Sequence, residues 1–139
     1  MEVFTPMKAR SYKEVVDLVI SQILMASSNV RSVSLITPLG TLRQFRMRED
    51  VTLLLNTEEM GELVRSINTS TSPFYKFLPK LGMLRHLYLD FENLHALVFP
   101  LPDRNTLLVG LEKMEQDIPS ITQYIMKLLQ QNEMTYDDD

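Results

Sequence analysis

The stretch from Leu87 to Leu111 constrains the fold most, because its strand-forming residues are interrupted only twice by polar turn residues. The interruptions are Glu92-Asn93 and the run "PDRN" at 102–105. Connections this short join neighbouring antiparallel strands. The middle segment is apolar at nearly every position, so we expect both of its faces to be covered and the strand to lie centrally in a sheet. The predicted strands are Met83 to Phe91, Leu94 to Leu101 and Thr106 to Leu111.

The residues before this stretch predict a helix followed by a hairpin. Ser11 and Glu14 have the spacing of a capping box, which predicts a helix from about Tyr12 to Ser27. The segment "VRSVSLI" alternates like a half-buried strand, the turn residues 37–40 follow, and "TLRQFRM" reads as the second strand. The apolar face of the helix comprises Tyr12, Val15, Val16, Val19, Ile20 and Ile23.

Two more helices are predicted. Asn56 and Glu59 form a second cap signal for a helix over roughly Thr57 to Asn68, whereas "VTLLL" just before it fits either a strand or a helix lead-in. The run "NTSTSP" predicts the end of this helix, and "FYKFLPKLGM" predicts a short irregular turn. The last helix follows Asp117, with an apolar face of Ile121, Tyr124, Ile125, Leu128 and Leu129.

These elements predict one compact α+β domain with a five-stranded antiparallel sheet and three helices, in the order α-β-β-α-β-β-β-α. At 139 residues the chain is long enough for one self-sufficient core. We expect an N-terminal segment at 1–10, a single domain at 11–131 and a flexible acidic tail at 132–139. The strand order does not follow from the pattern.

The composition narrows the functional classes. The chain has no cysteine, which excludes disulfides, thiolate metal sites and cysteine nucleophiles and favours a reducing cytoplasm. Its net charge of -4 argues against nucleic-acid binding, and no apolar run is long enough to serve as a signal peptide or to insert into a membrane. We therefore expect a cytoplasmic protein without nucleic-acid partners.

The sequence contains little that could support catalysis. His86 and His95 fall on neighbouring strands near Asp90 and Glu92, but two histidines without a third ligand are a weak metal signal, and ordinary solvent-facing strand positions explain them better. The four glycines are isolated, so no phosphate-binding or dinucleotide motif is present. We predict no catalytic residue, no cofactor and no metal site.

Apolar and charged residues suggest binding surfaces instead. Met60, Leu63, Val64 and Ile67 form an apolar stripe at helical spacing, and aromatic residues follow it at 74–77. A domain of this size would have difficulty burying all of them, and exposed apolar patches tend to be interaction sites; the alternative is that all of them fit inside the domain. Charge is concentrated around the second strand, in Arg43, Arg46 and Arg48.

The segments "VRSVSLITPLGTL" and "HALVFPLPDRNTLLVGLEKMEQDIPSI", within the same order of elements, resemble the roadblock family, named for a dynein light chain and related to the longin and profilin-like folds. The resemblance covers about Tyr12 to Leu129. Thr37 stands where the family usually has an aspartate, and its hydroxyl can serve the same turn. Roadblock-like domains are generally non-enzymatic scaffolds that dimerise, and several work with small Ras-like GTPases or in motor and signalling assemblies.

The resemblance implies a dimer with itself or with a paralogous subunit, in which second helices pack together and third strands pair. Its interface would comprise Met60, Leu63, Val64, Ile67, Leu84, His86 and Tyr88. A small GTPase would be a further partner, with Arg43, Arg46 and Arg48 as candidate contacts. The alternative is a profilin-like module that senses a small molecule near Phe91 and Phe99.

Overall fold

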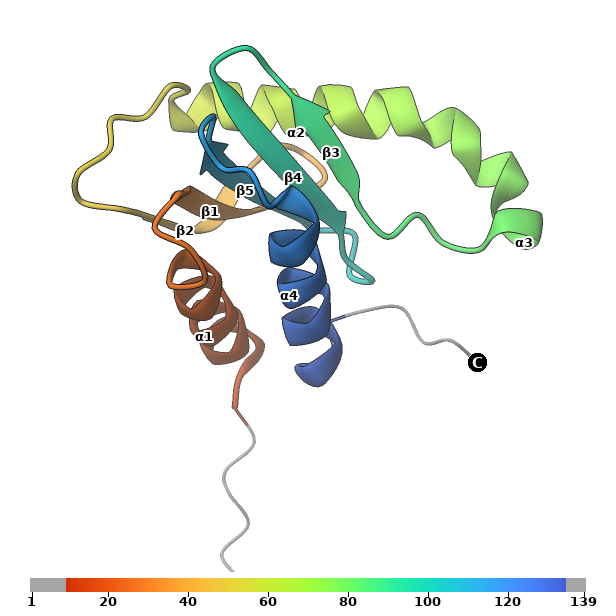
Figure 1. The fold of residues 1–139 in the computed structure, drawn as a ribbon. Coiled ribbons are helices and arrows are strands. Elements are labelled where there is room, and N and C mark those ends of the chain that lie inside the picture. Colours follow the sequence, from red (N-terminus) through yellow and green to blue (C-terminus); the bar gives the residue numbers. More distant parts are fainter. Residues whose placement is uncertain (1–9, 135–139) are drawn as a thin grey trace, which may run out of the picture.

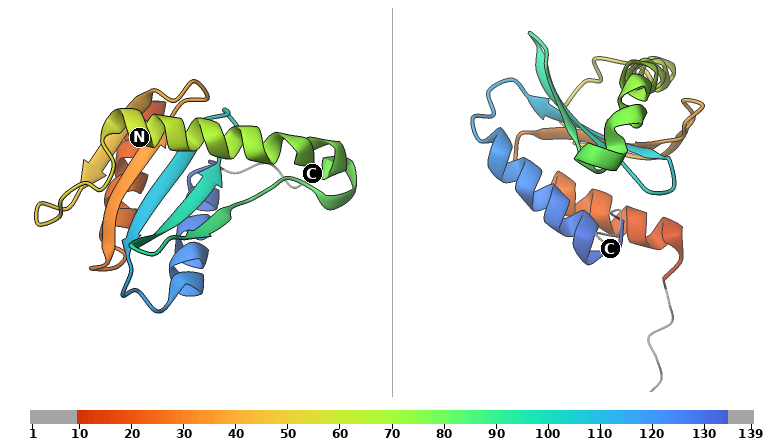
Figure 2. Two further views of the ribbon diagram at one scale, coloured as in Figure 1. Left: turned by 90° about the horizontal axis from the view of Figure 1, so that it is seen from above. Right: turned by 90° about the vertical axis from the view of Figure 1, so that its right-hand side faces the viewer.

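The computed structural model describes residues 10–134, in which one antiparallel sheet lies between helices (Figure 1). The two views in Figure 2 show α1 and α4 side by side on one face of the sheet and α2 on the opposite face. The elements are α1 (Tyr12–Leu24), β1 (Val30–Ile36), β2 (Leu42–Met47), α2 (Thr57–Thr71), the 3₁₀ helix η1 (Ser72–Phe77), α3 (Leu78–Leu81), β3 (Leu87–Asp90), β4 (Leu94–Pro100), β5 (Thr106–Glu112) and α4 (Ile118–Gln131). This order confirms the predicted fold class, with two short helical turns added after α2.

The predicted cap signals begin the helices. The Asn56 side chain accepts from the Glu59 N–H at 2.8 Å, and the Glu59 carboxylate accepts from the Asn56 N–H at 3.0 Å. At α1 the Ser11 hydroxyl accepts a hydrogen bond from the Glu14 N–H. The Glu14 carboxylate in turn accepts a hydrogen bond from the Ser11 hydroxyl. The helix ends at Leu24, three residues before the predicted Ser27, because Ser27 caps the following turn by accepting from the Asn29 N–H.

The predicted end of the second helix at Asn68 is wrong. The helix continues to Thr71, because the Thr71 hydroxyl donates to the Ile67 carbonyl at 3.0 Å and Ser72 donates in the same way to Thr69. Such back-bonding lets a hydroxyl residue remain inside a helix. Pro73 then occupies the first turn of η1, where its missing N–H costs no hydrogen bond.

The strand order is β2-β1-β5-β4-β3, so β5 is the middle strand and β4 lies beside it. Both faces of β4 are covered, as the apolar run predicted. β3 is shorter than predicted, and the register explains why. Leu87 lies opposite Val98, so the next hydrogen-bonded pair would join Arg85 to Pro100, which has no N–H to donate.

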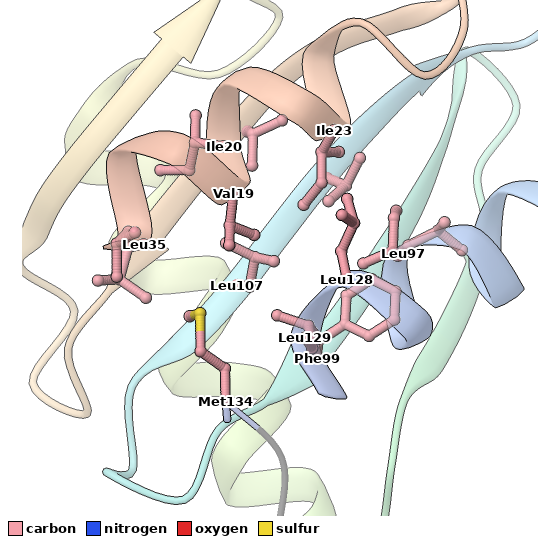
Figure 3. Packing of buried hydrophobic residues seen from close by; sticks show 14 of the residues in the cluster. Val19, Ile20, Ile23, Leu35, Leu97, Phe99, Leu107, Leu128, Leu129 and Met134 are labelled. Atoms are coloured by element: carbon pink, nitrogen blue, oxygen red, sulfur yellow. The ribbon is translucent and has the colours of Figure 1, made fainter. Parts of the chain in front are cut away.

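The larger part of the core lies between the sheet and the pair α1 and α4 (Figure 3). Phe99, Leu97 and Leu107 from the sheet meet Ile20 and Ile23 of α1 there, and all five side chains are fully buried. Met134, which follows the predicted boundary at residue 131, also packs into this cluster. Residues 1–9 of the predicted N-terminal segment (1–10) and residues 135–139 of the predicted tail (132–139) lie outside the described residues.

Two residues assigned to apolar helix faces are not in the core. Tyr124 and Tyr12 are each more than 40% exposed. The Tyr12 hydroxyl instead donates to the Asp103 carboxylate in the β4–β5 hairpin. Burial of part of the ring and this hydrogen bond raise the pKa of Tyr12 to about 12.

The hydrogen bond between Tyr12 and Asp103 should stabilise the folded protein except at strongly alkaline pH. Because the folded-state pKa is above the ordinary value of 10.0, the stabilisation is fully present below pH 10 and is lost as the pH rises towards about 12. We expect Tyr12→Phe to be modestly less stable than wild type in urea unfolding below pH 10, with the difference disappearing near pH 12. A tyrosinate absorbance titration should show one late ionisation in wild type that the variant lacks; an unchanged titration would contradict the assignment.

No helix within residues 10–134 is long and apolar enough to cross a membrane.

Candidate interaction site

β3 forms one edge of the sheet, because within residues 10–134 it pairs only with β4. The Phe91 N–H bonds to the Leu94 carbonyl, so the backbone groups of Leu89 also face β4. The backbone N–H and C=O groups of Tyr88 and Asp90 therefore point away from the sheet. An edge of this kind can accept another strand through its backbone.

A hydrogen-bond network stands behind this edge. The buried His95 ring contacts the Tyr88 hydroxyl through Nδ1 at 2.7 Å and the Lys113 carbonyl through Nε2 at 3.1 Å. A carbonyl can only accept, so neutral His95 carries its proton on Nε2 and Nδ1 accepts from Tyr88. Lys113 also bonds to the exposed Asp90 and lowers the pKa of that carboxyl. The network ties β3 to the end of β5 and so holds the edge in place.

Beyond α2 the chain forms an apolar projection that we call the arm, residues 72–83. Figures 1 and 2 show that it continues the line of α2 past the sheet on the β3 side and then returns to begin β3. No residue of η1 or α3 is buried. The large exposed apolar side chains of the arm are Phe74, Tyr75, Phe77, Leu81 and Met83.

At the opposite end of β3 the structure contains a cavity of about 570 Å³. Its walls come from the loop 51–55, the first turns of α2, the β3–β4 hairpin and the middle of the sheet. Leu53, Met60, Leu63 and Leu94 make most of the lining apolar, and Phe91 stands at the hairpin. The loop residues, whose sequence fitted either a strand or a helix, form neither. Arg31 holds this loop by donating to the Thr52 carbonyl at 2.5 Å and pairing with Glu112 at 2.7 Å.

The predicted interface stripe lies mostly inside the protein, which corrects its placement on the surface. Met60, Val64 and Ile67 are at most 9% exposed, because they pack against β1, β4 and β5. Leu63 is only partly buried at the cavity wall. The sequence pattern identified an apolar helical face correctly, but the sheet of the same chain already covers it.

The predicted strand residues of the interface have a different environment. Tyr88 and His86 are exposed and Leu84 is half-buried, so all three flank the β3 edge. The His86 ring lies beside the Phe99 ring at a centroid distance of 6.0 Å and a tilt of 32°, whereas His95 is buried in the network described above. His95 is thus not the solvent-facing residue predicted. Among residues 10–134 no group of three or more histidine and carboxylate side chains could hold a metal ion.

The three arginines do not form one patch. Arg46 donates to the Ser21 hydroxyl at 2.6 Å, and Arg48 pairs with Asp50 at 3.5 Å. Arg43 is exposed on β2, the other edge strand. For the alternative ligand site, Phe91 does line the cavity, but Phe99 is buried in the core on the opposite face of the sheet.

Sequence reasoning missed the arm and the cavity as separate features. The signal for the arm was present in "FYKFLPKL", where three aromatic residues are mixed with two lysines and one proline without helical or strand periodicity. The cavity has no comparable local signal, since its walls come from five separate segments.

No protein-family model matches the sequence, and no curated protein matches it. Solved structures do match the fold. The gliding protein MglB from Thermus thermophilus superposes with a TM-score of 0.68 at 13% identity, over 95% of this chain and 97% of that chain.

A roadblock/LC7 domain from Streptomyces avermitilis matches with a TM-score of 0.57 at 12% identity, over 86% of this chain and 98% of that chain. LokiProfilin1, in a complex with rabbit actin, matches with a TM-score of 0.52 at 11% identity, over 88% and 96%. These likenesses, with the order of elements described above, show that the chain has the roadblock-like fold, which is related to profilin.

Proposed function

We propose that this chain is a non-enzymatic scaffold or regulator that dimerises through β3 and acts with a small Ras-like GTPase or a larger signalling or motor assembly. The observation that carries the proposal is the outward-facing backbone of Tyr88 and Asp90 on an edge strand flanked by an apolar arm. Pairing of two such strands satisfies both rows of backbone groups at once. A solved structure of MglB in a tetrameric arrangement supports self-association for this fold.

The proposed interface keeps Leu84, His86 and Tyr88 and does not use the buried stripe. Leu63, partly buried at the cavity wall, lies at its margin. A paralogous roadblock-like subunit could replace the second copy, because backbone pairing places few demands on side chains.

We expect Tyr88→Pro to shift the dimer towards monomer, weakening it by at least about tenfold. Proline removes the outward N–H but leaves the bonds between β3 and β4 intact. Tyr88→Phe is the matched control, since it loses the hydroxyl contact to His95 and keeps the N–H. Analytical ultracentrifugation of the full chain measures both; a wild-type monomer at micromolar concentration, or a Tyr88→Pro dimer of unchanged strength, would refute pairing at β3.

The role with a GTPase is what the resemblance to the roadblock family implies, and the superposition on the MglB proteins supports the fold on which that role depends. A scaffold can alter GTP hydrolysis by ordering the loops of the GTPase, without a catalytic residue of its own. Arg43 is the best placed of the three predicted contacts, because Arg46 and Arg48 are held by neighbours. Affinity capture from native extract should enrich a Ras-like GTPase, and Arg43→Glu should reduce its recovery while Lys127→Glu on α4 should not.

The cavity favours a second candidate function, a small-molecule sensor. Its volume of about 570 Å³ and its apolar lining fit a small ligand. Native mass spectrometry of the purified full chain tests this directly. A retained small molecule in a monomeric protein would favour sensing over scaffolding.

A further inference from the structure

The arm and the cavity lie at opposite ends of the same edge strand. Leu84, Arg85 and His86 connect the arm to the start of β3, and the hairpin beginning at Phe91 follows its end and lines the cavity. Within one chain the two features therefore lie apart, with the part of α2 that follows Leu63 between them. Both lie on the face of the sheet that carries α2, because the arm continues α2 and the cavity is walled by its first turns.

A twofold axis beside β3, between the two paired strands, brings the arm of one chain to the cavity of the other. Two strands paired by such an axis run antiparallel, so the start of one lies beside the end of its partner. The axis is perpendicular to the sheet, which keeps both arms and both cavities on the same face. We propose, on the basis of the proposed β3 dimer, that the arm of each protomer docks onto the cavity of the other, so that the site is complete only in the dimer.

The chemistry of the two surfaces is complementary. The arm presents exposed Phe77 and Leu81, and the cavity rim presents exposed Leu54 and Phe91. Joining these surfaces removes apolar area from water on both sides, which stabilises the contact. Neither surface has an apolar partner of its own within the described chain that covers it.

The charges agree with this pairing. The arm carries Lys76 and Lys80 and no carboxylate. The cavity has Glu92 in its wall, and the first turns of α2 beside it carry exposed Glu58 and Glu62. The cation in the wall, Arg31, is already paired with Glu112. A basic arm therefore approaches an acidic rim.

Cysteine crosslinking tests the contact, because the chain has no cysteine of its own. Equal amounts of Leu81→Cys and Glu92→Cys proteins are mixed, allowed to exchange subunits and treated with a short bismaleimide. Both positions are exposed, so the variants should fold. We expect a covalent dimer in the mixture and much less in either protein alone. Met25→Cys, on an exposed residue at the end of α1, replaces Leu81→Cys in the matched control and should give no such product.

Charge reversal gives an independent measurement. Lys80→Glu and Glu92→Lys should each weaken the dimer by about two- to fivefold, as expected for rim charges, and the mixture of the two variants should recover part of the loss. Sedimentation measures the dissociation constants.

The outcomes separate this proposal from the dimer on which it rests. If the wild type sediments as a dimer sensitive to Tyr88→Pro but the mixture gives no crosslink above the Met25→Cys control, the arm contact is wrong and the β3 dimer stands. If the wild type is a monomer, both are wrong. A small molecule that copurifies in the cavity of an uncrosslinked dimer would also overturn the arm contact.

Discussion

Replacing Gly61 with alanine is expected to destabilise the fold by about 3 kcal/mol or more, although alanine favours helices. A Cβ at Gly61 would lie 2.0 Å from the Gly40 carbonyl oxygen, because α2 crosses the β1–β2 turn at backbone contact. The turn cannot easily retreat, since Arg65 donates to the Leu39 carbonyl at 2.9 Å and Thr37 accepts from the Thr41 N–H at 3.0 Å. The gain in helix propensity, roughly 1 kcal/mol, is too small to offset this clash.

Urea unfolding followed by circular dichroism measures the effect of Gly61→Ala. Ser66→Ala is the matched control, because Ser66 lies on the exposed side of the same helix and should change stability by only a few tenths of a kcal/mol, about the propensity difference. A Gly61→Ala protein as stable as the control would show that the turn and the helix are further apart than described.

Val64→Glu is expected to unfold the protein rather than to release a folded monomer. Val64 is fully buried between α2 and the sheet, so the substitution places a carboxylate among apolar side chains with no partner. An unpaired buried charge costs about 3–5 kcal/mol, a large fraction of the 5–15 kcal/mol that stabilises a typical domain. This result would distinguish a core position from the surface position that the sequence pattern suggested.

The measurement combines circular dichroism with sedimentation. Ser66→Glu, two residues along α2 and facing solvent, should leave the fold intact. A folded, monomeric Val64→Glu protein would contradict the burial of this position and would return the stripe to the dimer interface.

Local patterns predicted the elements of this fold well. The strand at Val30–Ile36 and the helix starts at Tyr12 and Thr57 follow from alternation and from capping side chains, which act within a few residues. The order of elements also pointed to the roadblock-like fold, which the solved structures confirm. Errors occurred at element ends, where Thr71 adds a side-chain hydrogen bond and Pro100 lacks the N–H that a further strand pair would need; a periodic pattern contains neither effect.

The candidate site could be predicted only in part. Tyr88 and its neighbours lie on the edge strand, but whether a strand is at an edge depends on pairing between distant segments. The apolar stripe of α2 also could not be interpreted from its local pattern alone. An apolar helical face fits a partner protein or the sheet of its own chain equally well, and only the packing of α2 onto β1, β4 and β5 decides between them.

The sequence by itself determined the order of the helices and strands and the absence of cysteine chemistry, because these depend on residue type and near-neighbour spacing. The tertiary structure decided which apolar residues are covered, how closely Gly61 approaches Gly40, and that the arm and the cavity lie at the two ends of β3. These properties arise from contacts between residues far apart in the chain. Burial of a side chain is a property of all the segments around it, and no local pattern carries that information.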